Sequence, residues 1–234
     1  MRMKMNEIFL HDLCSAYYSR GKQGLCYHVD MKKIVVKKHK WIVGVDEVGR
    51  GPLAGPVAVG AVAINSAIYG LRLKKEFKGI RDSKKLSEKQ REEWFKKIKI
   101  VEKRGDIKLT VSMTSPSIID KKGIVFSIQN ALNNSLLKLN ISPERLQIFL
   151  DGGLKAGKEY KNQKTIIHGD DLVQIISIAS VVAKVTRDRL MRRYAKKFPR
   201  YGFESHKGYG TKAHYLAIKK YGTTKIHRQS FLKS

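Results

Sequence analysis

The sequence predicts an α/β domain in which a mixed central sheet is flanked by helices and followed by a helical C-terminal region. Short apolar segments alternate with longer segments of helical periodicity, which is the pattern of strands layered against helices. The apolar segments are continuous rather than strictly alternating, so we expect several strands to be buried on both faces. Capping signals mark the starts of helices: Ser87 stands three residues before Gln90, and Ser115 precedes Pro116.

The expected elements follow from these signals in order. Runs rich in valine, isoleucine and alanine predict strands over residues 41–46 and 56–64, and the capping box predicts a helix over about 87–100. A strand over 107–113 precedes a helix over about 116–139, which begins at a proline. Short apolar runs predict strands over 146–151 and 164–168. A largely apolar helix follows over about 172–196, and the last helix, over about 211–221, ends before Gly222, a suitable C-terminal cap.

Composition excludes several classes of protein. A chain of 234 residues with 42% hydrophobic residues is long enough for one large domain with its own core, which argues against disorder. Lys and Arg number 48 against 20 Asp and Glu, a net charge of +28 that favours a polyanionic partner. The two cysteines, Cys14 and Cys26, have no metal-binding spacing, so neither a disulfide scaffold nor a zinc ribbon is expected. This cysteine content fits a reducing, cytoplasmic location.

Neither export nor membrane insertion fits the sequence. Charged residues interrupt the first thirty positions, so these lack the apolar core of a signal peptide. The uncharged stretch over residues 51–71 contains prolines and glycines that would break a spanning helix. We treat residues 1–40 as an N-terminal extension of uncertain status and residues 41–234 as one catalytic domain. One hypothesis is that translation starts at Met31, which peptides from residues 5–28 of the natural protein would refute.

Positive charge is concentrated at the C-terminal end. Residues 184–234 contain fifteen basic and two acidic residues, whereas residues 105–153 contain five and four. Any single lysine on a helix is best explained by a solvated face. The excess of basic over acidic residues across residues 184–234 instead favours a surface that binds phosphates.

Acidic residues stand at the ends of three predicted strands. Asp46 and Glu47 end the first strand, Asp151 ends the fourth, and Asp170 follows the fifth. Adjacent carboxylates on a regular strand point to opposite faces, so we expect the strand to end at this pair and the glycines that follow to turn the backbone. Taken alone, Asp46 and Glu47 are explained equally well as an acidic turn at a strand end that forms a salt bridge with a nearby lysine. Three acidic strand ends in so basic a chain predict a divalent metal site beside a phosphate-binding surface, and hence phosphodiester chemistry.

The sequence resembles a known family, ribonuclease HII, the bacterial type 2 ribonuclease H. The blocks that carry the resemblance occur in the order of the family and span about residues 41–232. They are the segments VDEVGRGPLAGPV at residues 45–57, RDSKKLS at 81–87, LDG at 150–152, IAS at 178–180 with Ala183-Lys184 and Arg187-Asp188, Phe198-Pro199, HKGYGT at 206–211 and HRQSF at 227–231. The fold that the resemblance implies is the ribonuclease H-like mixed sheet flanked by helices.

The resemblance also implies roles for individual residues. Asp46, Glu47, Asp151 and Asp170 stand where the family has its catalytic, metal-binding carboxylates. His168 and Asp171 depart from the family's usual Lys and Ser around the fourth acid. Spacing favours Asp170 for that role, and Asp171 either raises metal affinity or faces solvent.

Substrate-binding positions are implied in the same way. Gly49, Arg50 and Gly51 resemble the loop that senses the ribose 2′-OH through backbone groups, and Tyr209 resembles the tyrosine that assists it. Close approach of a backbone to a sugar requires glycine, and the 2′-OH is the group that separates RNA from DNA. Further implied contacts to phosphates come from Ser83, Lys84 and Lys184. We rank an ion pair between Lys184 and Asp188 above a catalytic role for Asp188, and packing above metal binding for the C-terminal histidines.

The expected function is an endoribonuclease that hydrolyses the RNA strand of RNA/DNA hybrids and cuts 5′ of ribonucleotides embedded in duplex DNA. The expected cofactor is Mg²⁺ or Mn²⁺, with two ions during catalysis, and the expected state is a monomer without a membrane partner. Ribonuclease HIII is the alternative within the superfamily, although Arg50 and the short leader favour HII. A non-catalytic basic RNA-binding protein is the alternative outside it, but such a protein gives no reason for acids at three strand ends.

Overall fold

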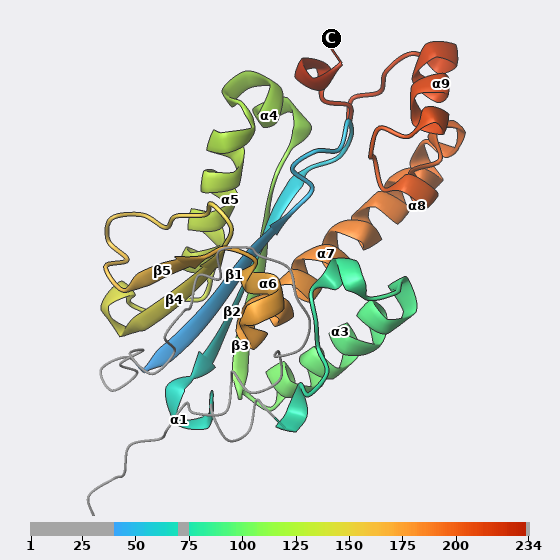
Figure 1. Ribbon diagram of the computed structural model, residues 1–234. Coiled ribbons are helices and arrows are strands. Elements are labelled where there is room, and N and C mark those ends of the chain that lie inside the picture. The colour runs from blue at the N-terminus through green and yellow to red at the C-terminus, as the bar shows by residue number, and fades with distance from the viewer. Residues whose placement is uncertain (1–39, 70–74, 233–234) are drawn as a thin grey trace, which may run out of the picture.

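The computed structural model describes residues 40–69 and 75–232. Its centre is a five-stranded sheet in the order β3-β2-β1-β4-β5, with helices on both faces (Figure 1). The strands are β1 (Trp41–Val48), β2 (Val57–Asn65), β3 (Ile107–Thr114), β4 (Leu146–Asp151) and β5 (Gln163–Ile166). β1, β2 and β3 pair antiparallel, whereas β1, β4 and β5 pair parallel. The predicted mixed sheet is therefore confirmed.

Helices cover the two faces of the sheet and extend beyond one end of it (Figure 1). The long helices are α3 (Glu88–Lys103), α5 (Ile124–Lys138), α7 (Gln174–Lys197) and α9 (Lys212–Tyr221). The short ones are α1 (Ser66–Tyr69), α4 (Pro116–Lys122), α6 (Gly169–Leu172) and α8 (Phe203–His206), with single 3₁₀ turns η4 (Ser83–Lys85), η5 (Pro143–Arg145), η6 (Pro199–Tyr201) and η7 (Gln229–Phe231). The capping box of Ser87 and Gln90 forms as predicted. Within the described residues, no helix is both long and apolar enough to cross a bilayer.

Three predicted boundaries were wrong. The helix expected over 116–139 is divided into α4 and α5 at Gly123, whose φ of 83° does not continue a helix. The strand expected over 164–168 ends at Ile166, because His168 adopts a left-handed conformation and caps α6. Likewise, β1 does not end at Asp46 but continues to Val48. The predictions for residues 1–39, including the Met31 start, lie outside the described residues.

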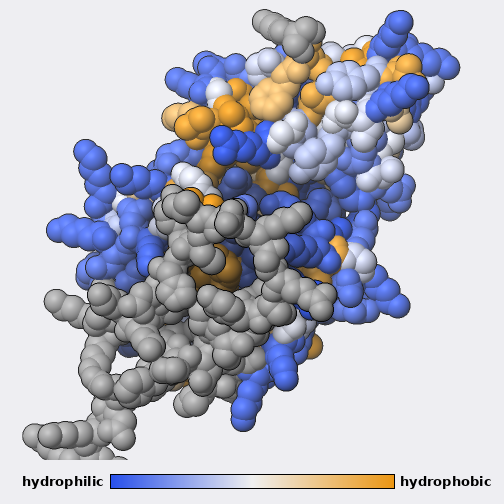
Figure 2. Space-filling view, in the orientation of Figure 1, coloured by the Kyte–Doolittle hydropathy of each residue, from blue (hydrophilic) through white to orange (hydrophobic). Residues whose placement is uncertain are grey.

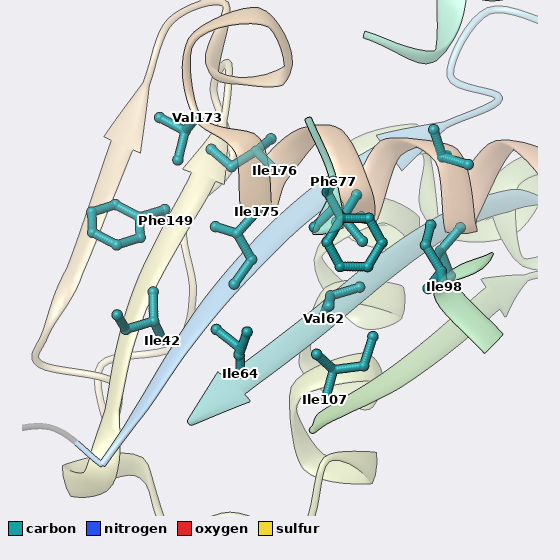
Figure 3. Close-up of a cluster of buried hydrophobic side chains, with 14 of the residues drawn as sticks. Ile42, Val62, Ile64, Phe77, Ile98, Ile107, Phe149, Val173, Ile175 and Ile176 are labelled. Atoms are coloured by element: carbon teal, nitrogen blue, oxygen red, sulfur yellow. The ribbon is translucent and has the colours of Figure 1, made fainter. Parts of the chain in front are cut away.

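Two hydrophobic cores lie on opposite faces of the sheet. One is formed by side chains of β1 and β2 with α3 and α7, and Figure 3 shows Ile42, Val62 and Ile64 of the sheet beneath Ile175 of α7. The other is formed by the alternate side chains of β1, β2 and β4 with α4 and α5. Trp41 and Trp94 lie partly buried at the margins of these cores.

Helix α7 crosses the sheet at very short range because glycines occupy the crossing points. A Cβ atom at Gly44 of β1 would lie 2.3 Å from the carbonyl oxygen of Ile175, and one at Gly60 of β2 would lie 2.8 Å from that of Ala179. These contacts are with backbone atoms, which cannot move aside as a flexible side chain can. The glycines therefore set the distance between α7 and the strand that carries Asp46.

We expect Gly44→Ala to lower the free energy of unfolding by about 1–3 kcal/mol, because the added methyl group must push α7 away from β1. Urea unfolding measures this change. Gly153→Ala is the matched control, since a Cβ there meets no atom within 4 Å, and it should change stability by less than about 0.5 kcal/mol. Equal effects of the two substitutions would contradict the close-contact explanation.

Candidate active site

The first two acidic side chains of the site come from β1 at the point where its pairing with β4 stops. β1 and β4 pair as far as Val45 and Leu150, while the β2 side of β1 remains paired through Val48. The Glu47 N–H donates a hydrogen bond to Asp46 Oδ1 over 2.8 Å, so the Asp46 carboxylate folds back over the strand. No glycine turn is needed at this pair, contrary to the prediction, because the free edge of β1 leaves room for both carboxylates.

The third carboxylate arrives from the neighbouring parallel strand. Asp151 ends β4, and parallel neighbours place their carboxyl ends at the same edge of a sheet. Oxygen atoms of Asp46, Glu47 and Asp151 all lie within 4.8 Å of one another. The predicted convergence of acids that are far apart in sequence is therefore found for these three.

Asp170 lies beside this group, although not at a strand end. It lies in the first turn of α6, and its backbone N–H is 3.3 Å from Asp151 Oδ1. Asp170 is 5% exposed, whereas Asp171 lies at the surface and pairs with Lys85 over 2.6 Å. Asp170 and Asp171, the two candidates for the fourth carboxylate, are thus placed differently: Asp170 is turned inward, and Asp171 lies at the surface.

Burial and mutual repulsion weaken the ionisation of this cluster. Loss of hydration raises the pKa of Asp46 well above its ordinary value, and the nearby charges of Glu47, Asp151 and Asp170 raise it further. A hydrogen bond with Ser180 of α7 opposes the rise. Burial likewise raises the pKa values of Glu47 and Asp151. Like-charged groups held this close favour a cation between them.

The carboxylates fit a divalent ion by their chemistry. Among the described residues, none of Asp46, Glu47 and Asp151 forms an ion pair with a basic side chain, despite the large excess of lysine and arginine in the chain. Hard cations such as Mg²⁺, Mn²⁺ and Ca²⁺ take carboxylate oxygens as ligands. The cluster therefore supplies the oxygen ligands that such an ion requires, and Arg50 and Lys84 only partly offset its charge.

A second acidic group contains a residue that the sequence analysis did not single out. Oxygen atoms of Asp82, Asp170 and Asp171 lie within 4.8 Å of one another, and Asp82 is only 6% exposed. Asp82 accepts a hydrogen bond from the Lys84 N–H over 2.9 Å, and Lys84 Nζ lies 3.4 Å from Asp170 Oδ2. The only sequence signal for Asp82 was its position directly before Ser83 and Lys84, where it caps η4.

Two buried arginines fix the loop that follows β1. Arg228 donates to the carbonyl oxygens of Gly49, Arg50 and Gly55 over 2.6, 2.9 and 2.9 Å. Arg187 of α7 donates to the carbonyl oxygens of Pro56, Ala54 and Lys207 over 2.9, 3.2 and 3.1 Å. Both side chains are 0% exposed. Burial and the neighbouring Arg187 guanidinium lower the pKa of Arg228 to about 9.

Sequence reasoning matched both arginines to motifs but did not give them this role. No local signal indicates that a cation will be satisfied by carbonyl oxygens of a distant loop. Gly49 is the position that makes the arrangement possible: its φ is 87°, and a Cβ there would lie 2.3 Å from Arg187 Nε. The loop over residues 49–56 is therefore held from beneath by guanidinium groups.

The turn that carries Tyr209 is attached to the same loop. Leu53 N–H donates to the Gly208 carbonyl over 2.8 Å, and a Cβ at Gly208 would lie 2.4 Å from the Ala54 carbonyl oxygen. The Tyr209 ring lies 6.0 Å from the Arg187 guanidinium and remains 41% exposed. The structure thus brings Tyr209 and the Gly49–Gly51 segment onto one connected surface, although they are far apart in sequence.

The remaining predicted contacts lie on η4 and α7. Ser83 is 3% exposed, and its Oγ accepts a hydrogen bond from Ser180 over 2.8 Å. Lys84 is accessible to a ligand, since its side chain is 75% exposed although Nζ lies 3.4 Å from Asp170 Oδ2. The predicted ion pair of Lys184 with Asp188 is present at 2.8 Å and partly buried. Phosphate contacts by Ser83, Lys84 and Lys184 stay predictions.

Hydrophilic side chains cover much of the surface around α3 and α7 (Figure 2). Four basic residues of α7, Arg189, Arg192, Arg193 and Lys196, line a shallow hollow against Phe95 of α3. Arg189 and Arg192 are partly neutralised by Glu88 and Glu92. The basic C-terminal segment therefore forms a charged outer surface, as its composition predicted.

The family is decided by a match of residues 43–234 to the family model described as Ribonuclease HII. The chain belongs to the ribonuclease HII family. A protein named Ribonuclease HII from Caldicellulosiruptor bescii is 41% identical over 203 residues, which are 87% of this chain and 92% of that protein. One from Coxiella burnetii is 43% identical over 190 residues, 81% of this chain and 87% of that protein.

The fold agrees with that membership. The crystal structure of ribonuclease H2 from Pyrococcus horikoshii OT3 superposes with a TM-score of 0.63 at 26% identity, covering 83% of this chain and 100% of that one. As a member of the ribonuclease HII family, the protein is an endoribonuclease acting on RNA/DNA hybrids. Both the ribonuclease HIII alternative and the non-catalytic RNA-binding alternative are thereby set aside.

We expect Asp46→Asn to stabilise the metal-free ribonuclease by about 1–2 kcal/mol at pH 8, because the folded state then loses a buried charge among like charges. The pKa of Asp46 is raised on folding, so its ionisation opposes folding at high pH and this penalty disappears as the carboxyl group is protonated. The difference between variant and wild type should therefore shrink as the pH falls. Urea unfolding in EDTA measures it.

The exposed Asp171 provides the control, since Asp171→Asn should change stability by less than about 0.5 kcal/mol. An Asp46→Asn variant that is less stable than wild type in EDTA at pH 8 would contradict the electrostatic description of the cluster.

Proposed function

We propose that this ribonuclease HII hydrolyses the RNA strand of hybrids and also cuts on the 5′ side of single ribonucleotides in duplex DNA, leaving 3′-OH and 5′-phosphate ends. The observation that carries the proposal is the cluster of Asp46, Glu47 and Asp151, unpaired with any described basic side chain and adjoining the anchored loop over residues 49–56. A catalytic centre and a site for sugar recognition therefore adjoin each other at the end of β1.

Asp46, Glu47, Asp151 and Asp170 would hold Mg²⁺ or Mn²⁺, with two ions present during catalysis. Such ions, when bound, activate a water molecule and stabilise the leaving oxygen of a phosphodiester. The protein's own contribution is to fix the carboxylates on the ends of β1 and β4 and on α6. Among the residues that the structure describes, no lysine or arginine forms an ion pair with the first three of these carboxylates, which leaves their oxygen atoms available to a cation.

The loop over residues 49–56 would select the ribonucleotide. Arg228 occupies the carbonyl oxygens of Gly49 and Arg50, so this backbone cannot rotate freely when a sugar approaches. A Cβ at Gly51 would meet no protein atom within 4 Å, which leaves open space for the substrate at this position. Tyr209 offers an exposed ring and hydroxyl group beside the loop. Recognition of the 2′-OH by closely approaching backbone groups fits this surface.

Substrate would be drawn to the site by the basic surface and the exposed Lys84. The negative carboxylates alone would repel a phosphodiester, so bound cations and surrounding basic side chains are both needed. We further propose that the protein acts as a cytoplasmic monomer, with residues 41–234 as its catalytic domain.

The cleavage test uses a DNA duplex that contains one ribonucleotide, incubated with the protein and Mn²⁺ or Mg²⁺. We expect a single cut on the 5′ side of the ribonucleotide, and Asp170→Asn should lower kcat by about 10³-fold, because several kcal/mol of transition-state stabilisation depend on the bound ions. Asp171→Asn is the matched neighbour and should retain activity within about threefold.

Gel mobility of labelled products, with and without phosphatase, identifies the ends. An intact strand under both metals would refute the proposed cleavage. Loss of activity in Asp171→Asn with retention in Asp170→Asn would reverse the assignment of the fourth carboxylate.

Gly51→Ala tests sugar recognition separately from catalysis. The added methyl group meets no protein atom, so the Tm should stay within about 1–2 °C of wild type, whereas kcat/KM on the single-ribonucleotide duplex should fall about 10- to 100-fold as the sugar is pushed outward. Gly153→Ala is the control glycine. Unchanged kcat/KM in Gly51→Ala would show that the sugar does not approach this backbone.

A further inference from the structure

Three histidines, His206, His214 and His227, lie together beneath the turn that carries Tyr209. His214 is 0% exposed and His227 is 2% exposed, and both pack against Phe203, while His206 stacks on His214 with ring centroids 4.4 Å apart. Neither group of possible metal ligands found among the described residues includes them. They are buried titratable groups that the proposed catalytic centre does not use.

The hydrogen bonds of these rings determine where each proton lies. Thr224 N–H donates to His227 Nδ1 over 2.8 Å, and a backbone N–H can only donate, so His227 carries its proton on Nε2. His227 Nε2 lies 3.1 Å from His214 Nε2, which must therefore accept. The proton of His214 is then on Nδ1, 2.9 Å from the carbonyl oxygen of Tyr209. A continuous chain of donors runs from Thr224 to Tyr209.

His206 obeys the same rule. Gly208 N–H donates to His206 Nδ1 over 3.2 Å, so the proton of His206 lies on Nε2, which is 2.7 Å from the carbonyl oxygen of Tyr201. All three rings are thus fully satisfied as neutral imidazoles. Burial lowers the pKa of His206 and His227, and it lowers that of His214 to about 4, which favours the neutral form of each ring.

The backbone of the Tyr209 turn is consequently fixed on every side. His206 binds the Gly208 N–H, His214 binds the Tyr209 carbonyl, and Arg187 and Leu53 bind the carbonyls of Lys207 and Gly208. The Tyr209 side chain is left to face outward. A proton added to His214 would place two N–H groups opposite each other at the His227 contact and break the chain.

We propose that His206, His214 and His227 are positioning residues that hold the Tyr209 turn in its substrate-reading geometry as a chain of neutral imidazoles with fixed tautomers. This inference rests on the proposed role of Tyr209 in recognising the ribonucleotide. None of the three histidines is placed in contact with substrate. They act through the main chain of residues 208 and 209.

The first test reads the tautomers in the full-length protein at pH 7 by ¹⁵N-resolved NMR of the imidazole rings. We expect His206 and His227 to carry the proton on Nε2 and His214 to carry it on Nδ1, which is the minor tautomer of free histidine in water. The exposed ring of His168 is the internal reference for tautomers in exchange. His214 protonated on Nε2, whether neutral or charged, would overturn the proposal.

The second test compares two replacements of His214. Asn places an amide near the Nδ1 position and can still donate to the Tyr209 carbonyl, whereas Gln places its amide near the Nε2 position and cannot. We expect His214→Asn to keep kcat/KM on the single-ribonucleotide duplex within about threefold, and His214→Gln to lower it about 10- to 100-fold, the range expected when a reading group is misplaced. The reverse order would overturn the proposal.

A double-mutant cycle with Tyr209→Ala distinguishes positioning from general destabilisation. If His214 acts through Tyr209, the effect of His214→Gln should disappear in the Tyr209→Ala background, whereas losses that add in full would overturn the proposal. Tyr209→Ala with wild-type kcat/KM would instead refute the proposed sensing role itself, and the inference with it. In that case the NMR measurement of the tautomers would still test the histidine chain, because it does not depend on activity.

Discussion

The central constraint on this protein is the close placement of four carboxylates, of which only Asp170 forms an ion pair with a described basic side chain, in a chain of net charge +28. Asp46, Glu47 and Asp151 come together because β1 and β4 run parallel and end at the same edge of the sheet, and Asp170 reaches them from α6. Repulsion and lost hydration oppose this arrangement, as the raised pKa values show. The packing of both sheet faces must therefore supply the stability that keeps the acids in place.

The loop over residues 49–56, which we propose to recognise the substrate, depends on an opposite arrangement, in which buried cations are satisfied by neutral groups. Arg187 and Arg228 direct their guanidinium groups at carbonyl oxygens of residues 49–56 and of Lys207. Hydrogen bonds to charged donors are stronger than neutral ones, and unpaired buried charges are costly, so this loop is held firmly. The carboxylates are thus positioned by β1, β4 and α6, whereas the loop is positioned by the two arginines, so each of the two proposed binding sites has its own support.

Much of this organisation could be predicted from the sequence, for physical reasons that apply locally. The capping box at Ser87, the apolar strands and the acids before glycines are short-range signals, and they located the sheet, α3 and the carboxylate cluster. Two failures were local: the helix expected over 116–139 breaks at Gly123, and the left-handed His168 ends the fifth strand and begins α6. The others depended on longer-range contacts. β1 continues to Val48 because it pairs with β2, and the roles of Asp82, Arg187 and Arg228 follow from partners that only the folded chain supplies.

Helix α7 contributes Ser180 to the carboxylates and Arg187 to the loop, two turns further along the same rod. With a rise of about 1.5 Å per residue, these groups are spaced by roughly 10 Å along the axis. The glycines at its crossing points bring the rod directly against the strands. A single helix therefore sets the spacing between the carboxylate cluster and the loop proposed to recognise the sugar, and insertion of one residue between Ser180 and Arg187 would rotate one of these side chains relative to the other by about 100°.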